Sequence, residues 1–197
     1  YRRQRQMCIR DSQETVCGIM TDVVIALMPS AVYGCILFGF KAAAVLITCV
    51  GFAVLSEFLW DKALKKPNSV KDMSAVVTGL LLGMNLPPSL PIWQAAIGSI
   101  FAIIVVKQMF GGIGCNFANP AIAARIMLLV SFPASMTRFT EPISDTVSSA
   151  TPLLYADGTT SFTYSFKTLF FGMHAGSIGE TSAFLLIVGG LYLVIRR

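Results

Sequence analysis

Long apolar runs alternate with short polar intervals along most of the chain. Six such runs lie at residues 23–40, 42–60, 73–86, 92–106, 121–132 and 178–195. A helix needs about 20 residues, within a range of roughly 17–25, to cross the hydrocarbon core of a membrane. The first two runs meet that length. The pattern therefore predicts an all-α polytopic membrane protein with about six transmembrane helices.

The borders of these segments carry helix and turn signals. The first two segments are separated by Gly39–Lys41, which predicts a turn, and Pro29 predicts a kink in the first. The third segment is short, so it either crosses with the help of flanking residues or forms a broken, half-spanning helix. Its Gly79 and Gly83 allow close backbone packing. Asn119 directly before a proline predicts the start of the fifth helix.

Composition agrees with a membrane protein and raises a question about the N-terminus. Hydrophobic residues make up 55% of the 197 and charged residues only 13%, whereas soluble domains carry about 25% charged residues. Four of the 15 basic and one of the 10 acidic residues fall within residues 1–12. The codons of residues 7–11 resemble a sequencing-adapter end, so we expect residues 1–12 to be an artefact and 13–197 to be the membrane domain. The alternative is a natural basic tail. Without residues 1–12 the charge is only +2, which gives nucleic-acid binding no support.

The distribution of lysines predicts the orientation. Lys62, Lys65, Lys66 and Lys71 cluster between the second and third segments, and such loops face the cytoplasm. Alternation then places Lys107 and residues 111–118 at the cytoplasmic side as well. The Pro87–Pro91 turn and the long polar interval at 133–170 are expected outside.

The interval at 133–170 contains a hydroxyl-rich stretch, Asp145–Leu153. Pro152 favours an extended backbone at Thr151, which leaves its hydroxyl beside small neighbours. Taken alone, a threonine before a proline is usually a turn residue.

Five motifs in order strengthen the case for a functional stretch and cover most of residues 70 to 190. They are Ser74–Leu82 with Leu86-Pro-Pro88, Lys107-x-x-Phe-Gly-Gly-x-Gly114 continuing to Ala121, Ser131-Phe-Pro133 with Met136-Thr137, Asp145-x-x-Ser-Ser-Ala-Thr151, and Gly176-Ser-Ile-Gly-Glu-Thr-Ser182. Together they resemble a membrane flavoprotein family that comprises the RnfD component of the Rnf complex and the NqrB component of the Na+-translocating NADH:quinone oxidoreductase.

The resemblance implies a cofactor and its site. In that family the threonine closing the S-x-A-T run is esterified through the phosphate of FMN, which implies Thr151 as the acceptor. The cofactor-binding residues implied around it are Asp145, Ser148, Ser149 and Ala150. Ser149 departs from the glycine found in many members. A second, non-covalent riboflavin stays open.

The resemblance also implies a fold and a function. Members have about ten helices in two inverted halves, like a urea transporter, so this chain would hold the first half and one further helix. The compact 133–170 loop and Ser131-Phe-Pro133 favour the Rnf type. The implied protein is a subunit of an oxidoreductase in the bacterial cell membrane. It relays electrons through FMN, coupled to Na+ or H+ export, with the other Rnf subunits as partners. It has no nucleotide or Fe–S motif and is not expected to be the NAD or ferredoxin site. The alternatives are the quinone-reductase component and a non-redox urea-transporter-like channel.

Charged residues in or near the apolar segments complete the candidate site. Arg125 lies inside the fifth segment, where a charge costs at least about 2.5–3.5 kcal/mol. It either belongs to the cofactor site or extends to the cytoplasmic interface. Glu180 either caps a helix or assists ion coupling, and Arg138 and Lys167 are candidate cations for the phosphate. His174 is expected to be structural.

Overall fold

The computed structural model describes residues 16–65, 72–116, 118–139, 170–180 and 182–196. These residues contain helices and no strand. The helices are α2 (Val16–Ala63), α3 (Ser74–Met84), α4 (Ile92–Phe101), the π-helix η2 (Ala102–Gln108), α5 (Pro120–Ser131), α6 (Pro133–Met136) and α9 (Ala183–Arg196). The prediction of an all-α protein is confirmed.

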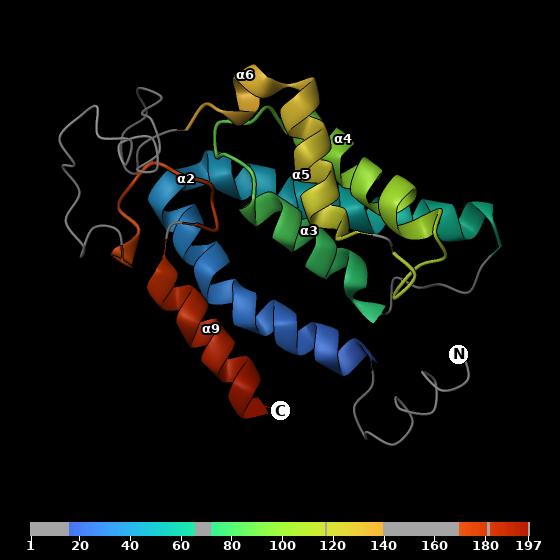
Figure 1. The fold of residues 1–197 in the computed structure, drawn as a ribbon, viewed down its shortest axis with the longest axis horizontal. Coiled ribbons are helices and arrows are strands. Elements are labelled where there is room, and N and C mark those ends of the chain that lie inside the picture. The colour runs from blue at the N-terminus through green and yellow to red at the C-terminus, as the bar shows by residue number, and fades with distance from the viewer. Residues whose placement is uncertain (1–15, 66–71, 117, 140–169, 181, 197) are drawn as a thin grey trace.

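Helix α2 is a hairpin of two arms, residues 16–38 and 40–63, that meet at Gly39 (Figure 1). Gly39 has φ 70° and ψ −157°, a combination that glycine adopts without the clash that a Cβ would cause. The predicted turn is therefore confirmed, and Gly39 rather than Pro29 is the residue at which α2 leaves helical torsions. Within the part of the chain that the structure describes, α2 alone is long and apolar enough to cross a membrane.

Helix α3 is short and lies between the other helices, with nine of its 11 residues buried. At about 1.5 Å per residue it measures roughly 16 Å, about half of the hydrocarbon thickness. Its glycines allow it to approach α2 closely. A Cβ at Gly79 would come within 2.8 Å of the Cys49 carbonyl oxygen, and one at Gly83 within 3.3 Å of Leu46 Cα. The close packing expected from these glycines is confirmed.

The fourth segment continues two residues beyond its predicted end and changes its winding. After α4 the chain forms η2, in which Met109 N–H donates to the Ile104 carbonyl at 3.0 Å, a bond that spans five residues. Apolar periodicity does not distinguish such a π-turn from an α-turn, so the sequence carried no signal for it. The start of α5 is as predicted: the Asn119 side chain accepts from Ala121 N–H at 3.0 Å.

The last segment begins later than its hydrophobicity predicts. Helix α9 starts at Ala183, whereas residues 175–179 form a buried, non-helical strap across the end of α3. Ile178 N–H donates to the Leu86 carbonyl at 3.2 Å, and Gly179 N–H to the Met84 carbonyl at 2.7 Å. These apolar residues cover backbone groups that the end of α3 leaves without helical partners.

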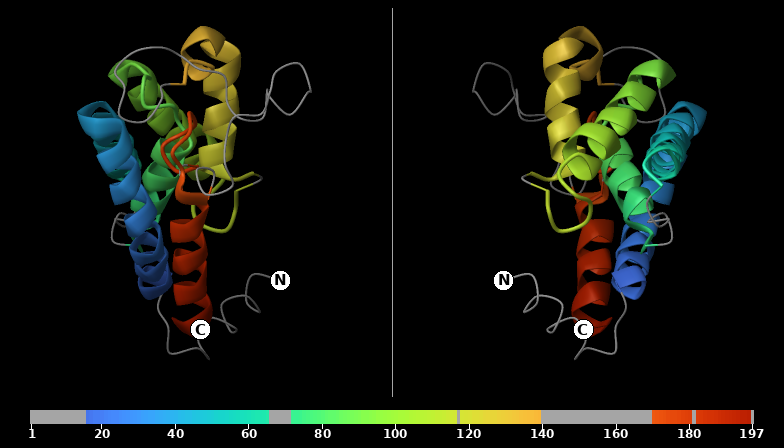
Figure 2. Two further views of the ribbon diagram at one scale, coloured as in Figure 1. Left: turned by 90° about the vertical axis from the view of Figure 1, so that its left-hand side faces the viewer. Right: turned by 90° about the vertical axis from the view of Figure 1, so that its right-hand side faces the viewer.

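Helix α9 lies alongside the first arm of α2 in both views of Figure 2. At its C-terminal end, Asp22 accepts from Tyr192 Oη at 3.2 Å and pairs with Arg196 at 3.3 Å. The outer faces of the helices carry large exposed apolar side chains, such as Ile36 at 72%, Ile47 at 70% and Val130 at 77%. An exterior of this kind suits lipid rather than water. The number of membrane crossings stays a prediction.

Candidate functional site

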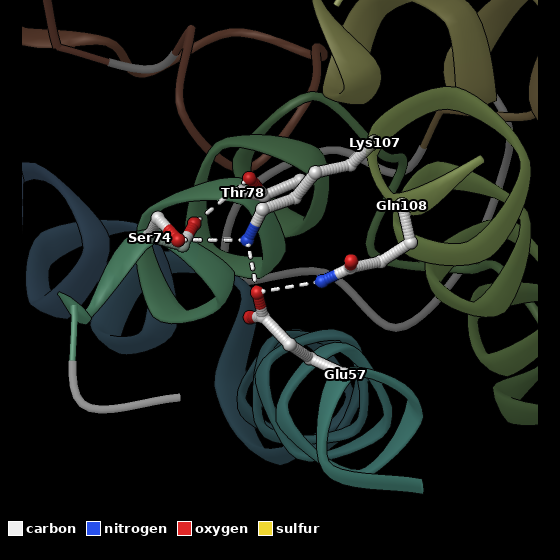
Figure 3. A network of polar contacts seen from close by, with 5 residues as sticks. All are labelled: Glu57, Ser74, Thr78, Lys107 and Gln108. Carbon is white, nitrogen blue, oxygen red and sulfur yellow. Dashed lines mark hydrogen bonds and ion pairs between the residues drawn. The ribbon is translucent and has the colours of Figure 1, made fainter. Parts of the chain in front are cut away.

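A buried ion pair joins α2 to the end of η2 (Figure 3). Lys107 Nζ lies 2.6 Å from Glu57 Oε1, and the two side chains are 3% and 0% exposed. Lys107 Nζ also donates to Ser74 Oγ at 2.7 Å, and Gln108 Nε2 donates to the same Glu57 oxygen at 3.0 Å. We call these four side chains the Glu57 network. It joins three elements that are far apart in the sequence.

The local structure of each element explains how the network forms. Consecutive side chains point about 100° apart around an α-helix, yet Lys107 and Gln108 both reach one oxygen. The wider π-turn of η2 brings neighbouring residues closer to a common direction. Ser74 is the first residue of α3, and its carbonyl accepts from Thr78 Oγ1 at 2.9 Å, which ties it to the next turn.

The sequence analysis missed this network. Lys107 was expected at the cytoplasmic end of the fourth segment, but it is 2% exposed and points into the bundle. Glu57 was not singled out, although an acid inside an apolar segment is the available signal for it. Lys107 alone gave no such signal, because a lysine at the end of an apolar segment usually extends into water.

Arg125 has a defined partner at the opposite end of α3. Its Nη1 donates to Asn85 Oδ1 at 3.0 Å, and Asn85 Nδ2 donates to the Leu81 carbonyl at 2.8 Å, which orients the amide. Arg125 is half-buried, and none of the carboxylates among the described residues forms an ion pair with it. The guanidinium therefore extends toward the C-terminal end of α3, away from Ser74 and the cytoplasmic end.

The hydroxyl-rich stretch itself, with Asp145, Ser148, Ser149, Ala150 and Thr151, lies outside the described residues, as does Lys167. Both described flanks of the interval are anchored. Ser89 Oγ donates to the Arg138 carbonyl at 2.6 Å, and Tyr33 Oη donates to the Phe171 carbonyl at 2.9 Å. Arg138 is exposed.

His174 and Glu180 flank the strap at the end of α3. Glu180 Oε2 accepts from Ser177 N–H at 3.4 Å, a long contact of the capping type. Burial lowers the pKa of His174, and the nearby Glu180 carboxylate partly offsets this shift. The neutral imidazole is therefore favoured, as suits the structural role expected of it.

Taken together, the apolar exterior, the hairpin α2 and the charged groups buried between short helices define an α-helical membrane protein with internal polar sites. The chain belongs to the NQR2, RnfD, RnfE family, whose model matches residues 5–197. The resemblance drawn from the five motifs is thereby confirmed.

Several curated relatives support the same assignment, and each is the D component of an ion-translocating complex. The chain is 47% identical over 189 residues to that of the Na+-translocating ferredoxin:NAD+ oxidoreductase complex of Acetobacterium woodii, covering 94% of the chain and 59% of the relative. It is 42% identical over 196 residues to that of the proton-translocating ferredoxin:NAD+ oxidoreductase complex of Clostridium ljungdahlii, covering 93% and 59%. It is 35% identical over 176 residues to that of the ion-translocating oxidoreductase complex of Shewanella sediminis, covering 88% and 47%. The chain thus spans about three-fifths of the length of the first two.

Proposed function

We propose that this chain is a membrane subunit of an ion-translocating electron transport complex of the ferredoxin:NAD+ oxidoreductase type. Its role would be to relay electrons while the complex exports Na+ or H+, with the other subunits of an Rnf-type complex as partners. The observation that carries the proposal is the similarity to the D components of such complexes along more than nine-tenths of the chain. The printed names of these relatives include both a Na+ and a proton translocator, so the similarity supports the class of ion without choosing between the two.

We further propose that the relay group is FMN, joined through its phosphate to the Thr151 hydroxyl. FMN supplies one-electron exchange when it is bound, and the protein around it tunes that chemistry. Thr151 would provide the attachment oxygen. Ser148, Ser149 and Ala150 are small enough to leave that oxygen accessible, and Asp145 opens the motif. A covalent link would retain the cofactor on the external side of the membrane.

The described residues that flank the interval are compatible with such a group. The two anchors, from Ser89 to Arg138 and from Tyr33 to Phe171, hold both ends of residues 140–169 to the helical bundle. A stretch of this length between fixed ends has room for a bulky ring system. A phosphate also favours a nearby cation, and the exposed Arg138 is available at the flank for this role.

The test is the fluorescence of the protein band after denaturing electrophoresis of the chain expressed with a flavin transferase. We expect flavin fluorescence that survives denaturation in the wild type and is lost in Thr151→Ala. Thr159→Ala is the matched control, because it removes a threonine of the same interval outside the motif, and it should stay fluorescent. A dark wild-type band would refute the covalent flavin, and a fluorescent Thr151→Ala band would refute the assigned residue.

The alternatives predict different results. A urea-transporter-like channel without a redox role has no use for a covalent flavin and would give a dark band. A quinone-reductase component would also fluoresce, so it is distinguished by the electron acceptor. Membranes that carry the assembled complex should reduce NAD+ with reduced ferredoxin, and a quinone requirement would favour the alternative.

A further inference from the structure

The pocket that holds the Lys107 ammonium has the chemistry of a cation site. Glu57 Oε1 and Ser74 Oγ contact the ammonium at 2.6 and 2.7 Å. An ammonium and a small metal cation are both satisfied by oxygen ligands that carry negative charge. Lys107 therefore fills the pocket as a cation tethered to the chain.

Stability alone does not explain why this pair exists. Replacing a buried ion pair by apolar side chains of similar volume is often neutral or stabilising, because removing two charges from water costs more than their attraction returns. Ionisable residues inside a membrane protein are rare for the same reason, and they commonly mark the path of an ion. The Glu57 network consequently indicates a functional pocket.

The backbone distinguishes the fixed partners from the movable one. Glu57 lies within the long second arm of α2, and Ser74 lies in the first turn of α3. Lys107 lies in the π-turn that leads directly into a glycine-rich break. In that break Gly111, Gly112 and Gly114 have φ of 109°, 89° and 79°. Glycines in this region of φ tolerate conformational changes that other residues resist, so Lys107 is the member that can withdraw.

A second carboxylate lies on the same side of α2. Asp61 follows Glu57 by four residues, which places both on one face of the helix, and it is only 4% exposed. It lies closer to the cytoplasmic end, where Lys62 is exposed. Two buried acids one turn apart provide negative charge along the approach from that end to the pocket.

We propose that the oxygens of Glu57 and Ser74 bind a small monovalent cation, whose place the Lys107 ammonium takes in the conformation seen here. When Lys107 withdraws, its four-carbon chain leaves space for water molecules, which a polar cavity readily holds. One positive charge replaces another, so the pocket remains neutral throughout. The inference rests on the proposed role in an ion-translocating complex, and Na+ is the probe for it.

The first experiment uses two variants of the full chain in detergent. Lys107→Met removes the tethered ammonium and leaves the carboxylate, whereas Glu57→Gln/Lys107→Met removes both charges. Thermal unfolding is followed in NaCl and in choline chloride at constant ionic strength. We expect the melting temperature of Lys107→Met to rise by about 3–6 °C for each tenfold increase of Na+ above its dissociation constant. The double variant should not respond.

The same titration can overturn the proposal. A response of Lys107→Met to acid but not to Na+ would mean that Glu57 takes a proton instead of a metal cation, and the cation site would be wrong. An equal response of both variants to Na+ would mean that the salt acts elsewhere on the protein. Either result excludes Glu57 as the ligand of a monovalent metal ion.

The second experiment uses the wild-type chain, so it does not depend on the folding of a variant. Lysines are reductively methylated at fixed pH, and the modified sites are quantified by mass spectrometry. Because the cation displaces Lys107 from the pocket, Na+ should increase methylation of Lys107 several-fold relative to choline. The exposed Lys62 is the internal control and should not change. Methylation of Lys107 that is independent of Na+ would overturn the displacement.

Neither readout requires a flavin, so the two proposals fail independently. A dark band on the gel together with Na+-dependent methylation would refute the covalent flavin only. A fluorescent band without any effect of Na+ on Lys107 would refute the cation pocket only.

Discussion

The substitution Glu57→Gln tests whether the Glu57 network is an electrostatic unit. The change keeps the size of the side chain but removes its negative charge. The Lys107 ammonium, 3% exposed and 2.6 Å from the former carboxylate, would then lose its counterion. Ser74 Oγ at 2.7 Å would remain as a neutral partner only.

The expected loss follows from the burial of both charges. Removing one partner of a buried ion pair costs about 3–5 kcal/mol, because the other charge is left uncompensated in a low-dielectric interior. For a chain of this size each kcal/mol shifts the melting temperature by about 2–4 °C. We therefore expect Glu57→Gln to lower the melting temperature by about 6–20 °C.

Two controls separate this effect from a general loss of packing. The double variant Glu57→Gln/Lys107→Met should regain most of the lost stability in the absence of Na+, since no buried charge remains. Arg196→Gln breaks the pair with Asp22, whose arginine side chain is 61% exposed, and exposed pairs contribute only about 0–1 kcal/mol. If Glu57→Gln is as stable as the wild type, or if the losses of the two single variants simply add in the double variant, the electrostatic account is wrong.

Three further predictions concern other parts of the structure. Gly79→Ala places a methyl group 2.8 Å from backbone atoms of α2 and should cost about 1–3 kcal/mol in unfolding experiments; Gly51→Ala, with no atom within 4 Å, is the control and should not destabilise. Asn85→Leu should cost about 1–3 kcal/mol by leaving the Arg125 guanidinium without its partner, and it should lose this effect when Arg125 is replaced by methionine. Because burial lowers the pKa of His174, the unfolded chain binds the proton more readily, so stability should fall as the pH drops below about 6.5. His174→Gln should flatten that part of the pH profile, and an unchanged profile would exclude the imidazole as its origin.

Several elements could be predicted because their causes are local. A glycine between two apolar runs permits the left-handed torsions of a turn, and the hairpin at Gly39 follows. Asn119 before Pro120 supplies a side-chain acceptor and a residue without N–H at the start of a helix, and α5 begins there. The glycines of α3 predicted a close neighbour, and only the structure identified that neighbour as the second arm of α2.

Other elements depended on contacts that no local pattern reveals. The residues 175–179 are as apolar as a helix, yet they form a strap because the carbonyls of Met84 and Leu86 accept their N–H groups. Lys107 was expected at an aqueous end of its segment, and it is buried because Glu57 compensates its charge. Arg125 alone was compatible with two directions, and its bond to Asn85 determines which one it takes.

By itself the sequence determined the class of the protein, the approximate segments, the family and the threonine proposed to carry FMN. These follow from hydrophobic runs, turn residues and short motifs, each of which acts within a few neighbouring residues. Only the tertiary structure decided which charges meet, because Glu57, Ser74 and Lys107 are separated by long stretches of chain and one of them depends on a π-turn. A buried charge is stable only beside its partner, and the identity of that partner is a property of the packed bundle.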